Sequence, residues 1–280
     1  MKEKKNILEI KNLNAEYSSS GILTKNKYFR ALYDISMNIP EGITIGIVGE
    51  SGSGKSTLGR ALVRLPGIFQ NNVKVIGEIL FHSNEKVIDI NEAKPEELKK
   101  IRKEIQIIFQ DPASSLSPKM TIRELISEPV RNFFKMSSRE ISEKFNEWVE
   151  LTGLGNIDAD SYPHQLSGGQ KQKVAIARSL SAGPSVLIAD EIVSALDVSV
   201  QGQILNLISD LKSKFNLTLI FISHDLSVIR NISDYVVVMN GGRIVEEGSV
   251  DKVFNEPEDE YTKKLLKAIP VIKFSPHPTK

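Results

Sequence analysis

Short apolar runs rich in β-branched residues alternate along this chain with segments whose apolar positions have helical spacing. Runs of about four to eight such residues are typical of buried strands. The predicted strands are 7–11, 31–37, 43–48, 77–81, 105–109, 186–190, 217–222, 235–240 and 243–247. Asn240-Gly241-Gly242 between the last two runs predicts a hairpin turn. Strands that alternate with helices predict an α/β fold with a mixed sheet, whose carboxyl edge carries the functional loops.

The strand pattern stops between residues 111 and 166. Segments 121–134 and 137–154 place apolar residues every three to four positions, which predicts helices broken at Pro129. We expect Trp148 and Leu151 to belong to a core of this insertion's own. The predicted organisation is a core of residues 1–110 and 167–255, a helical subdomain 111–166, and a tail 256–280 with a frayed end.

Composition and charge exclude several classes of protein. The chain has 280 residues, with 36 Lys+Arg against 35 Asp+Glu, so its near-zero net charge gives no reason to expect nucleic acid or anionic lipid as a partner. No apolar stretch approaches the roughly 18 residues that span a bilayer, and residues 1–13 lack the apolar core of a secretory signal. The absence of cysteine excludes disulfides and thiolate metal sites. We therefore expect a soluble intracellular protein.

The predicted strand 43–48 leads into GESGSGKST at residues 49–57, and helical spacing follows. This is the pattern G-x-x-x-x-G-K-[ST] in its strand, loop and helix context, which predicts a phosphate-binding loop. Glycines let the backbone N–H groups point at phosphate oxygens, and the helix start adds partial positive charge. The alternative is a Gly/Ser turn followed by a solvated lysine. The predicted phosphate-binding residues are Gly49, Ser51, Gly52, Ser53, Gly54, Lys55, Ser56 and Thr57.

Two further motifs suit a nucleotide site. Asp190 and Glu191 follow the apolar run 186–189, so one carboxylate would bind Mg²⁺ with Ser56 and the other would polarise a water for attack on the γ-phosphate. The sequence LSGGQ at 166–170 offers a hydroxyl and backbone N–H groups at a predicted helix start, which suits a second anion. Taken alone, these motifs also fit a strand that ends in a turn and a well-capped helix.

The order of motifs resembles the ATPase subunits of ABC transporters. GESGSGKST, Gln110 in IIFQDP, LSGGQ, VLIADE, SALD and ISHD follow one another as in that family, and the resemblance covers most of the chain. Within the family, QDPASSLSP and EPEDEYTKKLLKAIP are similar to the oligopeptide, dipeptide and nickel importers. The resemblance implies an α/β fold of the P-loop NTPase type, an ABC ATPase core with an antiparallel β subdomain and an inserted α-helical subdomain.

The resemblance also implies roles for single residues. Tyr17 falls where the family stacks an aromatic ring on adenine, with Tyr28 and Tyr33 as nearby competitors. Gln110 matches the glutamine that senses Mg²⁺ and the attacking water. Asp190 matches the acid associated with Mg²⁺.

Three more residues match catalytic or communicating positions. Glu191 matches the catalytic glutamate, His224 the histidine that contacts the γ-phosphate, and Asp197 the loop that communicates between paired sites. Each residue also has a purely structural alternative. Asp197 and His224 could cap helices, and Gln110 could be a loop amide that caps a backbone group. The histidines without such a match are His82, His164 and His277.

The family's subunits pair head to tail, and each ATP lies between the phosphate loop of one copy and Ser167, Gly168, Gly169 and Gln170 of the other. The resemblance therefore implies ATP and Mg²⁺ as cofactors, and a second ATPase subunit, identical or paralogous, as partner. It also implies two transmembrane permease subunits, an indirect link to an extracytoplasmic binding protein, and no nucleic acid. The expected location is the cytoplasmic face of the cell membrane.

Two departures from the family pattern bear on subfamily and cargo. Ile192-Val193 stand where the family has Pro-Thr, and Asp259-Glu260 stand where it has His-Pro.

The expected function is ATP hydrolysis coupled to import of peptides or of nickel and metal chelates. The alternatives are an ABC ATPase of an exporter or lipid transporter, a non-transport ABC ATPase, and a regulatory module that binds ATP without cleaving it.

Overall fold

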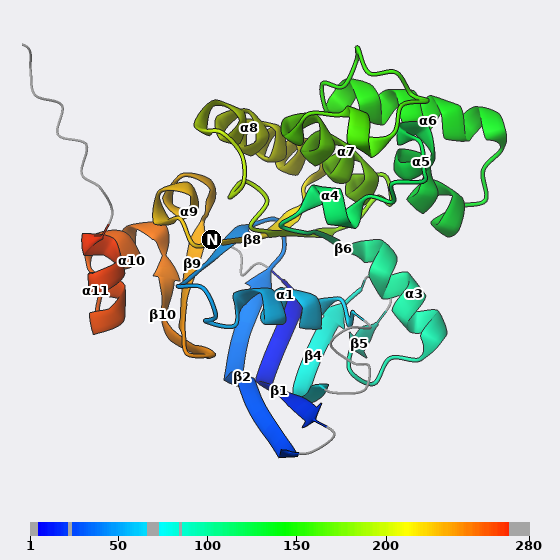
Figure 1. The fold of residues 1–280 in the computed structure, drawn as a ribbon. Coiled ribbons are helices and arrows are strands. Elements are labelled where there is room, and N and C mark those ends of the chain that lie inside the picture. The colour runs from blue at the N-terminus through cyan, green and yellow to red at the C-terminus, as the bar shows by residue number, and fades with distance from the viewer. Residues whose placement is uncertain (1–4, 22–23, 66–72, 84–85, 269–280) are drawn as a thin grey trace, which may run out of the picture.

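A six-stranded sheet forms the centre of the molecule (Figure 1). The computed structural model describes residues 5–21, 24–65, 73–83 and 86–268. The strand order is β10-β9-β3-β8-β7-β6, and every described pairing is parallel except β10 with β9. This edge pair is the predicted hairpin. The strands are β3 (Thr44–Val48), β6 (Ile105–Ile108), β7 (Val186–Asp190), β8 (Thr218–Ser223), β9 (Tyr235–Asn240) and β10 (Arg243–Ser249).

A second, antiparallel sheet has the order β2-β1-β4-β5. Two of its strands are much longer than the predicted 7–11 and 31–37, because their polar outer halves continue to pair across several β-bulges. The three-residue strand β5 was missed because it is too short to show a periodicity. The strands are β1 (Asn6–Gly21), β2 (Thr24–Pro40), β4 (Val73–His82) and β5 (Val87–Asp89).

Helices cover the parallel sheet, and α1 contacts strands of both sheets. Its Leu58 and Leu62 belong to a buried cluster that includes Ile10 of β1 and Ile188 of β7. The helices are α1 (Lys55–Leu62), α3 (Pro95–Glu104), α4 (Pro112–Ser115), α5 (Ile122–Phe133), α6 (Ser138–Leu151), a 3₁₀ turn (Pro163–Gln165), α7 (Gly168–Leu180), α8 (Val198–Phe215), α9 (Leu226–Ile232), α10 (Val250–Asn255) and α11 (Glu260–Lys267).

Residues 111–166 contain helices and no strand, but α5 runs through Pro129 instead of ending there. The predicted break was wrong because Leu125 and Val130, on either side of the proline, are both buried, and this packing holds the helix together. Thr121 and Glu124 form a capping box at its start.

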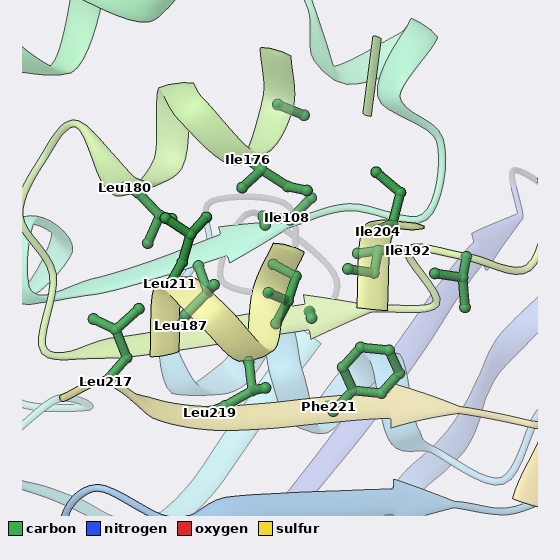
Figure 2. Close-up of a cluster of buried hydrophobic side chains, with 14 of the residues drawn as sticks. Ile108, Ile176, Leu180, Leu187, Ile192, Ile204, Leu211, Leu217, Leu219 and Phe221 are labelled. Carbon is green, nitrogen blue, oxygen red and sulfur yellow. The ribbon is translucent and has the colours of Figure 1, made fainter. Parts of the chain in front are cut away.

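The insertion does not have a core of its own, in contrast to the prediction. Trp148 belongs to the same buried cluster as Val174 of α7 and Phe221 of β8, and Leu151 packs against that cluster. Figure 2 shows the central part of this cluster, where Ile176 and Leu180 of α7 lie over the parallel strands. One continuous apolar core therefore connects the insertion to the sheet. The division of the chain at residues 110, 166 and 255 stays a prediction.

Candidate functional site

Three loops meet at the carboxyl edge of the parallel sheet. Val48 at the end of β3 pairs with Ser223 at the end of β8, and Asp190 at the end of β7 pairs with Ile222. The phosphate loop, the acidic pair and His224 therefore leave the sheet side by side, as expected where ligands bind in open α/β sheets.

The phosphate loop has the glycine-dependent conformation that its sequence predicts. Gly54 precedes α1 with φ of 101°, and a Cβ atom at this position would lie 2.7 Å from the carbonyl oxygen of Ala31. The carbonyl oxygen of Ser53 accepts a hydrogen bond of 3.0 Å from the N–H of Gly242 in the β9–β10 turn. Only glycine combines this left-handed φ with so close a backbone approach.

Lys55 is buried beneath its own loop. Its Nζ atom donates to the carbonyl oxygens of Gly49 at 2.8 Å and Glu50 at 2.9 Å, and it lies 4.0 Å from Oε1 of Glu191. Burial lowers the pKa of Lys55, while the Glu191 and Asp190 carboxylates act against that shift. The ammonium group is thus positioned in the loop's concavity, and the plain alternative of a solvated lysine is wrong.

Ser56 and Asp190 form the second pair of the site. The hydroxyl of Ser56 donates to Oδ1 of Asp190 at 2.9 Å, and burial raises the pKa of this carboxyl group. An alcohol oxygen and a carboxylate oxygen are ligands that Mg²⁺ accepts, together with phosphate oxygens and water. In the described residues no cluster of three or more His, Cys, Asp or Glu forms a complete metal cage. The donor set therefore fits a magnesium ion that arrives with phosphate groups.

Glu191 is the point where the predicted catalytic residues converge. Its Oε2 atom accepts a hydrogen bond of 3.1 Å from Nε2 of Gln110 and lies 3.1 Å from Nδ1 of His224. The backbone of Glu191 has a left-handed φ of 50°, a conformation that costs a non-glycine residue about 1–3 kcal/mol. The next two residues, Ile192 and Val193, are buried in the core cluster. This apolar packing anchors the turn where the family has Pro-Thr.

Two plain alternatives fail at this site. The side chain of Gln110 bonds to a carboxylate and not to the backbone group that a capping amide would bind. The cap of α9 is Asp225, whose Oδ1 atom accepts from the N–H of Ser227 at 2.8 Å, so His224 is not the cap. Asp197 stands at the N-cap position of α8 but makes no side-chain capping bond.

Tyr17 lies at the phosphate loop, with its hydroxyl 3.2 Å from Oγ1 of Thr57. Sequence reasoning missed Phe29, which pairs with Tyr17 across the β1–β2 ladder and is 65% exposed. Both rings line a cavity of about 380 Å³ together with the loop. Tyr33 instead lies beneath the guanidinium groups of Arg30 and Arg243. The side chain of Tyr28 is outside the described part of the chain.

The LSGGQ segment forms a second site that is separate from the first. Ser167 caps α7, since its Oγ accepts from the N–H of Gln170 and its N–H donates to Oε1 of Gln170 at 2.9 Å. These residues line a cavity of about 470 Å³, which also includes Asp197 and Lys173. The structure therefore brings together Lys55, Glu191, Gln110, His224 and, through its bond to Ser56, Asp190. It places Ser167, Gly168, Gly169, Gln170 and Asp197 at a different cavity.

The other histidines of the described residues, His82 and His164, have partners outside the phosphate loop. Nε2 of His82 is 3.3 Å from Oε1 of Glu9, and the ring of His164 stacks on Tyr162. His277 and the predicted frayed end lie outside the described residues. None of the described helices is both long and apolar enough to pass through a bilayer.

The chain is similar to known proteins over nearly its whole length. Residues 32–194 match the family described as ABC transporter. A dipeptide transport ATP-binding protein of Lactococcus lactis subsp. cremoris is 42% identical over 271 residues, which are 96% of this chain and 83% of that protein. An oligopeptide transport ATP-binding protein of Bacillus subtilis is 42% identical over 95% of this chain and 78% of its own length.

Solved structures agree with these sequence comparisons. A dimeric ATP-binding cassette in a post-hydrolysis state, bound to ADP and Pi, superimposes with a TM-score of 0.72 at 29% identity, covering 87% of this chain and 98% of that one. The chain therefore belongs to the ABC transporter family, as an ATP-binding cassette that hydrolyses ATP.

Proposed function

We propose that this chain is the ATP-hydrolysing subunit of an importer for oligopeptides or dipeptides. The observation that supports the chemistry is the convergence of Gln110 and His224 on one carboxylate oxygen of Glu191, beside the phosphate loop. The cargo class rests on the relatives, which are 42% identical over nearly the whole chain and carry the names of dipeptide and oligopeptide transport proteins. No observation on the chain favours nickel or a metal chelate.

Glu191 is the proposed general base. The Gln110 amide and the His224 ring hold its Oε2 atom, so the carboxylate is oriented before substrate arrives. A carboxylate fixed in this way accepts the proton of a water molecule aimed at the γ-phosphorus atom. Lys55 neutralises phosphate oxygens, and the backbone N–H groups of the loop bind the others. Tyr17 and Phe29 are the proposed aromatic platform for the adenine ring.

Ser56 and Asp190 are the proposed protein ligands of Mg²⁺, and Gln110 lines the same cavity as Ser56. When bound, the ion neutralises charge on the β- and γ-phosphate oxygens. The Ser56 hydroxyl donates a hydrogen bond to the buried Asp190 carboxylate and so offsets part of the cost of burying it.

Each ATP is proposed to be bound between two copies of an ATPase subunit. The phosphate loop and the residues Ser167, Gly168 and Gly169 line different cavities of one chain, so a single copy cannot apply both to one nucleotide. A head-to-tail pair removes this separation, and the similar solved cassette is a dimer. Residues at the second cavity, including Asp197, then belong to the partner's nucleotide site.

We further propose that the pair works on the cytoplasmic face of the cell membrane with two transmembrane permease subunits. A binding protein on the other side would deliver the cargo, and no nucleic acid takes part. The helical insertion is the proposed contact with the permeases, because its buried side chains belong to the same apolar core as the sheet that carries Glu191. Movement at the nucleotide can therefore be transmitted through packed side chains.

The test is uptake by proteoliposomes that contain the permease subunits and this chain, with the binding protein supplied on the opposite side of the membrane. Short peptides should accumulate only with ATP inside the compartment that holds the ATPase, and a Glu191→Gln subunit should give no uptake. Uptake of a nickel chelate without uptake of peptides would refute the peptide assignment, while leaving the ATPase activity of the chain intact.

A further inference from the structure

The C-terminal helix α11 lies against the phosphate loop, although residues 256–280 were predicted only as a tail. Figure 1 shows α11 next to α10 and β10, at the side of the parallel sheet. The hydroxyl oxygen of Tyr261 accepts a hydrogen bond of 3.0 Å from the backbone N–H of Glu50. These residues are 211 positions apart in the chain, so only the fold brings them together.

The segment that carries Tyr261 is fixed to the sheet at several points. The carboxylate of Glu246 in β10 accepts from the N–H groups of Glu258 at 2.8 Å and Asp259 at 3.1 Å. Asp259 then caps α11 by accepting from the N–H groups of Tyr261 and Thr262, and Thr262 is completely buried. Tyr261 therefore reaches the phosphate loop from a rigid support.

Glu50 is the second residue of the phosphate loop, and both of its backbone polar groups are bound. Its N–H donates to Tyr261, and its carbonyl oxygen accepts from Nζ of Lys55 at 2.9 Å and from the N–H of Ser53 at 3.2 Å. The parallel ladder of β3 ends at Val48, so these bonds lie beyond the sheet's own support. One turn after Tyr261, Leu265 lines the same cavity as Glu191 and His224.

We propose that Tyr261 is a positioning residue of the nucleotide site. Its hydroxyl holds the first peptide group of the phosphate loop in the conformation that receives the triphosphate. The loop therefore loses less conformational entropy when the nucleotide binds. Helix α11 would then line the ATP site through Tyr261 and Leu265. The inference deepens the proposed role of the loop, on which it rests.

The test removes one oxygen atom with Tyr261→Phe. The matched control is Tyr235→Phe, because Tyr235 is also half-buried and its pKa is also raised by burial. Tyr235 lies at the amino end of the parallel strands, whereas the phosphate loop follows their carboxyl end. The readouts are KM for ATP, kcat, and hydrogen exchange of the backbone amide of Glu50 in the nucleotide-free chain. Thermal unfolding reports any general loss of stability.

In Tyr261→Phe we expect KM to rise by about two- to tenfold, the range of one net hydrogen bond, with kcat unchanged. Exchange at Glu50 should accelerate by a similar factor, while Tyr235→Phe matches the wild type in both readouts. Unchanged KM and exchange would overturn the inference, and so would a lower unfolding temperature with faster exchange throughout and no change in KM. Lys55→Ala separates the two proposals: if it keeps its affinity for ATP, the assignment of the phosphate site itself fails.

Discussion

Nδ1 of His224 lies 3.1 Å from Oε2 of Glu191, and the same oxygen accepts a hydrogen bond from Gln110. The three side chains come from the loops that follow β8, β7 and β6. These strands are adjacent in the sheet. A movement of Glu191 would therefore displace side chains of all three loops. One of them, the loop of Gln110, leads directly into the helical insertion.

This arrangement predicts the effect of Glu191→Gln. The amide cannot accept the proton of the attacking water, so hydrolysis should fall by about 10²- to 10⁴-fold, while the phosphate loop still binds ATP. The ATP-bound dimer should therefore accumulate. Phosphate release measures the first effect, and size-exclusion chromatography with ATP measures the second. Hydrolysis at the wild-type rate would contradict the assignment of the base.

Asp190 gives a prediction about stability and pH. Burial raises the pKa of its carboxyl group above the ordinary value, so the folded chain binds a proton here more readily than the unfolded chain does. The charged carboxylate therefore destabilises the folded chain. The free energy of unfolding falls as the pH rises from the ordinary pKa through the raised pKa. Asp190→Asn should unfold at a higher temperature than the wild type near neutral pH, in the absence of nucleotide.

The difference should shrink as the pH falls toward about 3.9, the ordinary pKa of an Asp side chain, because the wild type then becomes neutral in both states. Thermal unfolding of both proteins across this range is the measurement. The variant should lose ATP hydrolysis at every pH. A variant less stable than the wild type at neutral pH would show that the attraction of Arg60 and Lys55 for the charged carboxylate outweighs the cost of burial, because the Asn oxygen can still accept from Ser56.

The central parallel strands β3, β7 and β8 could be predicted from the sequence because they are buried on both faces and their sequences are short apolar runs. The same reasoning failed for β1 and β2, whose outer halves have many polar residues and pair only because a neighbouring strand is present. The identities of Glu191 and His224 came from motif order, but their contact required the adjacency of β7 and β8. Nothing local in the sequence indicates that Tyr261 contacts Glu50, since the bond depends on the docking of a whole helix.

Gly54→Ala should be strongly destabilising. The substituted residue would need a φ of 101°, and its Cβ would lie 2.7 Å from the carbonyl oxygen of Ala31. The strained backbone alone costs about 1–3 kcal/mol, and relief of the clash would displace the start of α1 and weaken ATP binding. Gly202→Ala is the matched control, because its Cβ meets nothing within 4 Å and helix α8 should gain about 0.5–1 kcal/mol. Urea unfolding of both variants gives the comparison, and equal stabilities would contradict the conformation of the loop.

The head-to-tail pairing can be tested by disulfide formation, because the natural chain contains no cysteine. Ser51 in the phosphate loop and Ser167 at the start of α7 are both exposed and line separate cavities. If ATP brings them together across two copies, Ser51→Cys mixed with Ser167→Cys should form a disulfide-linked dimer, since the bond requires Cα atoms within about 7 Å. Both chains carry Glu191→Gln, so that the ATP-bound state persists.

Ser142→Cys, on the exposed face of α6, replaces Ser167→Cys in the control and should give no ATP-dependent product. Equal yields with and without ATP, or with both partners, would mean that the phosphate loop and the LSGGQ segment do not bind one nucleotide together.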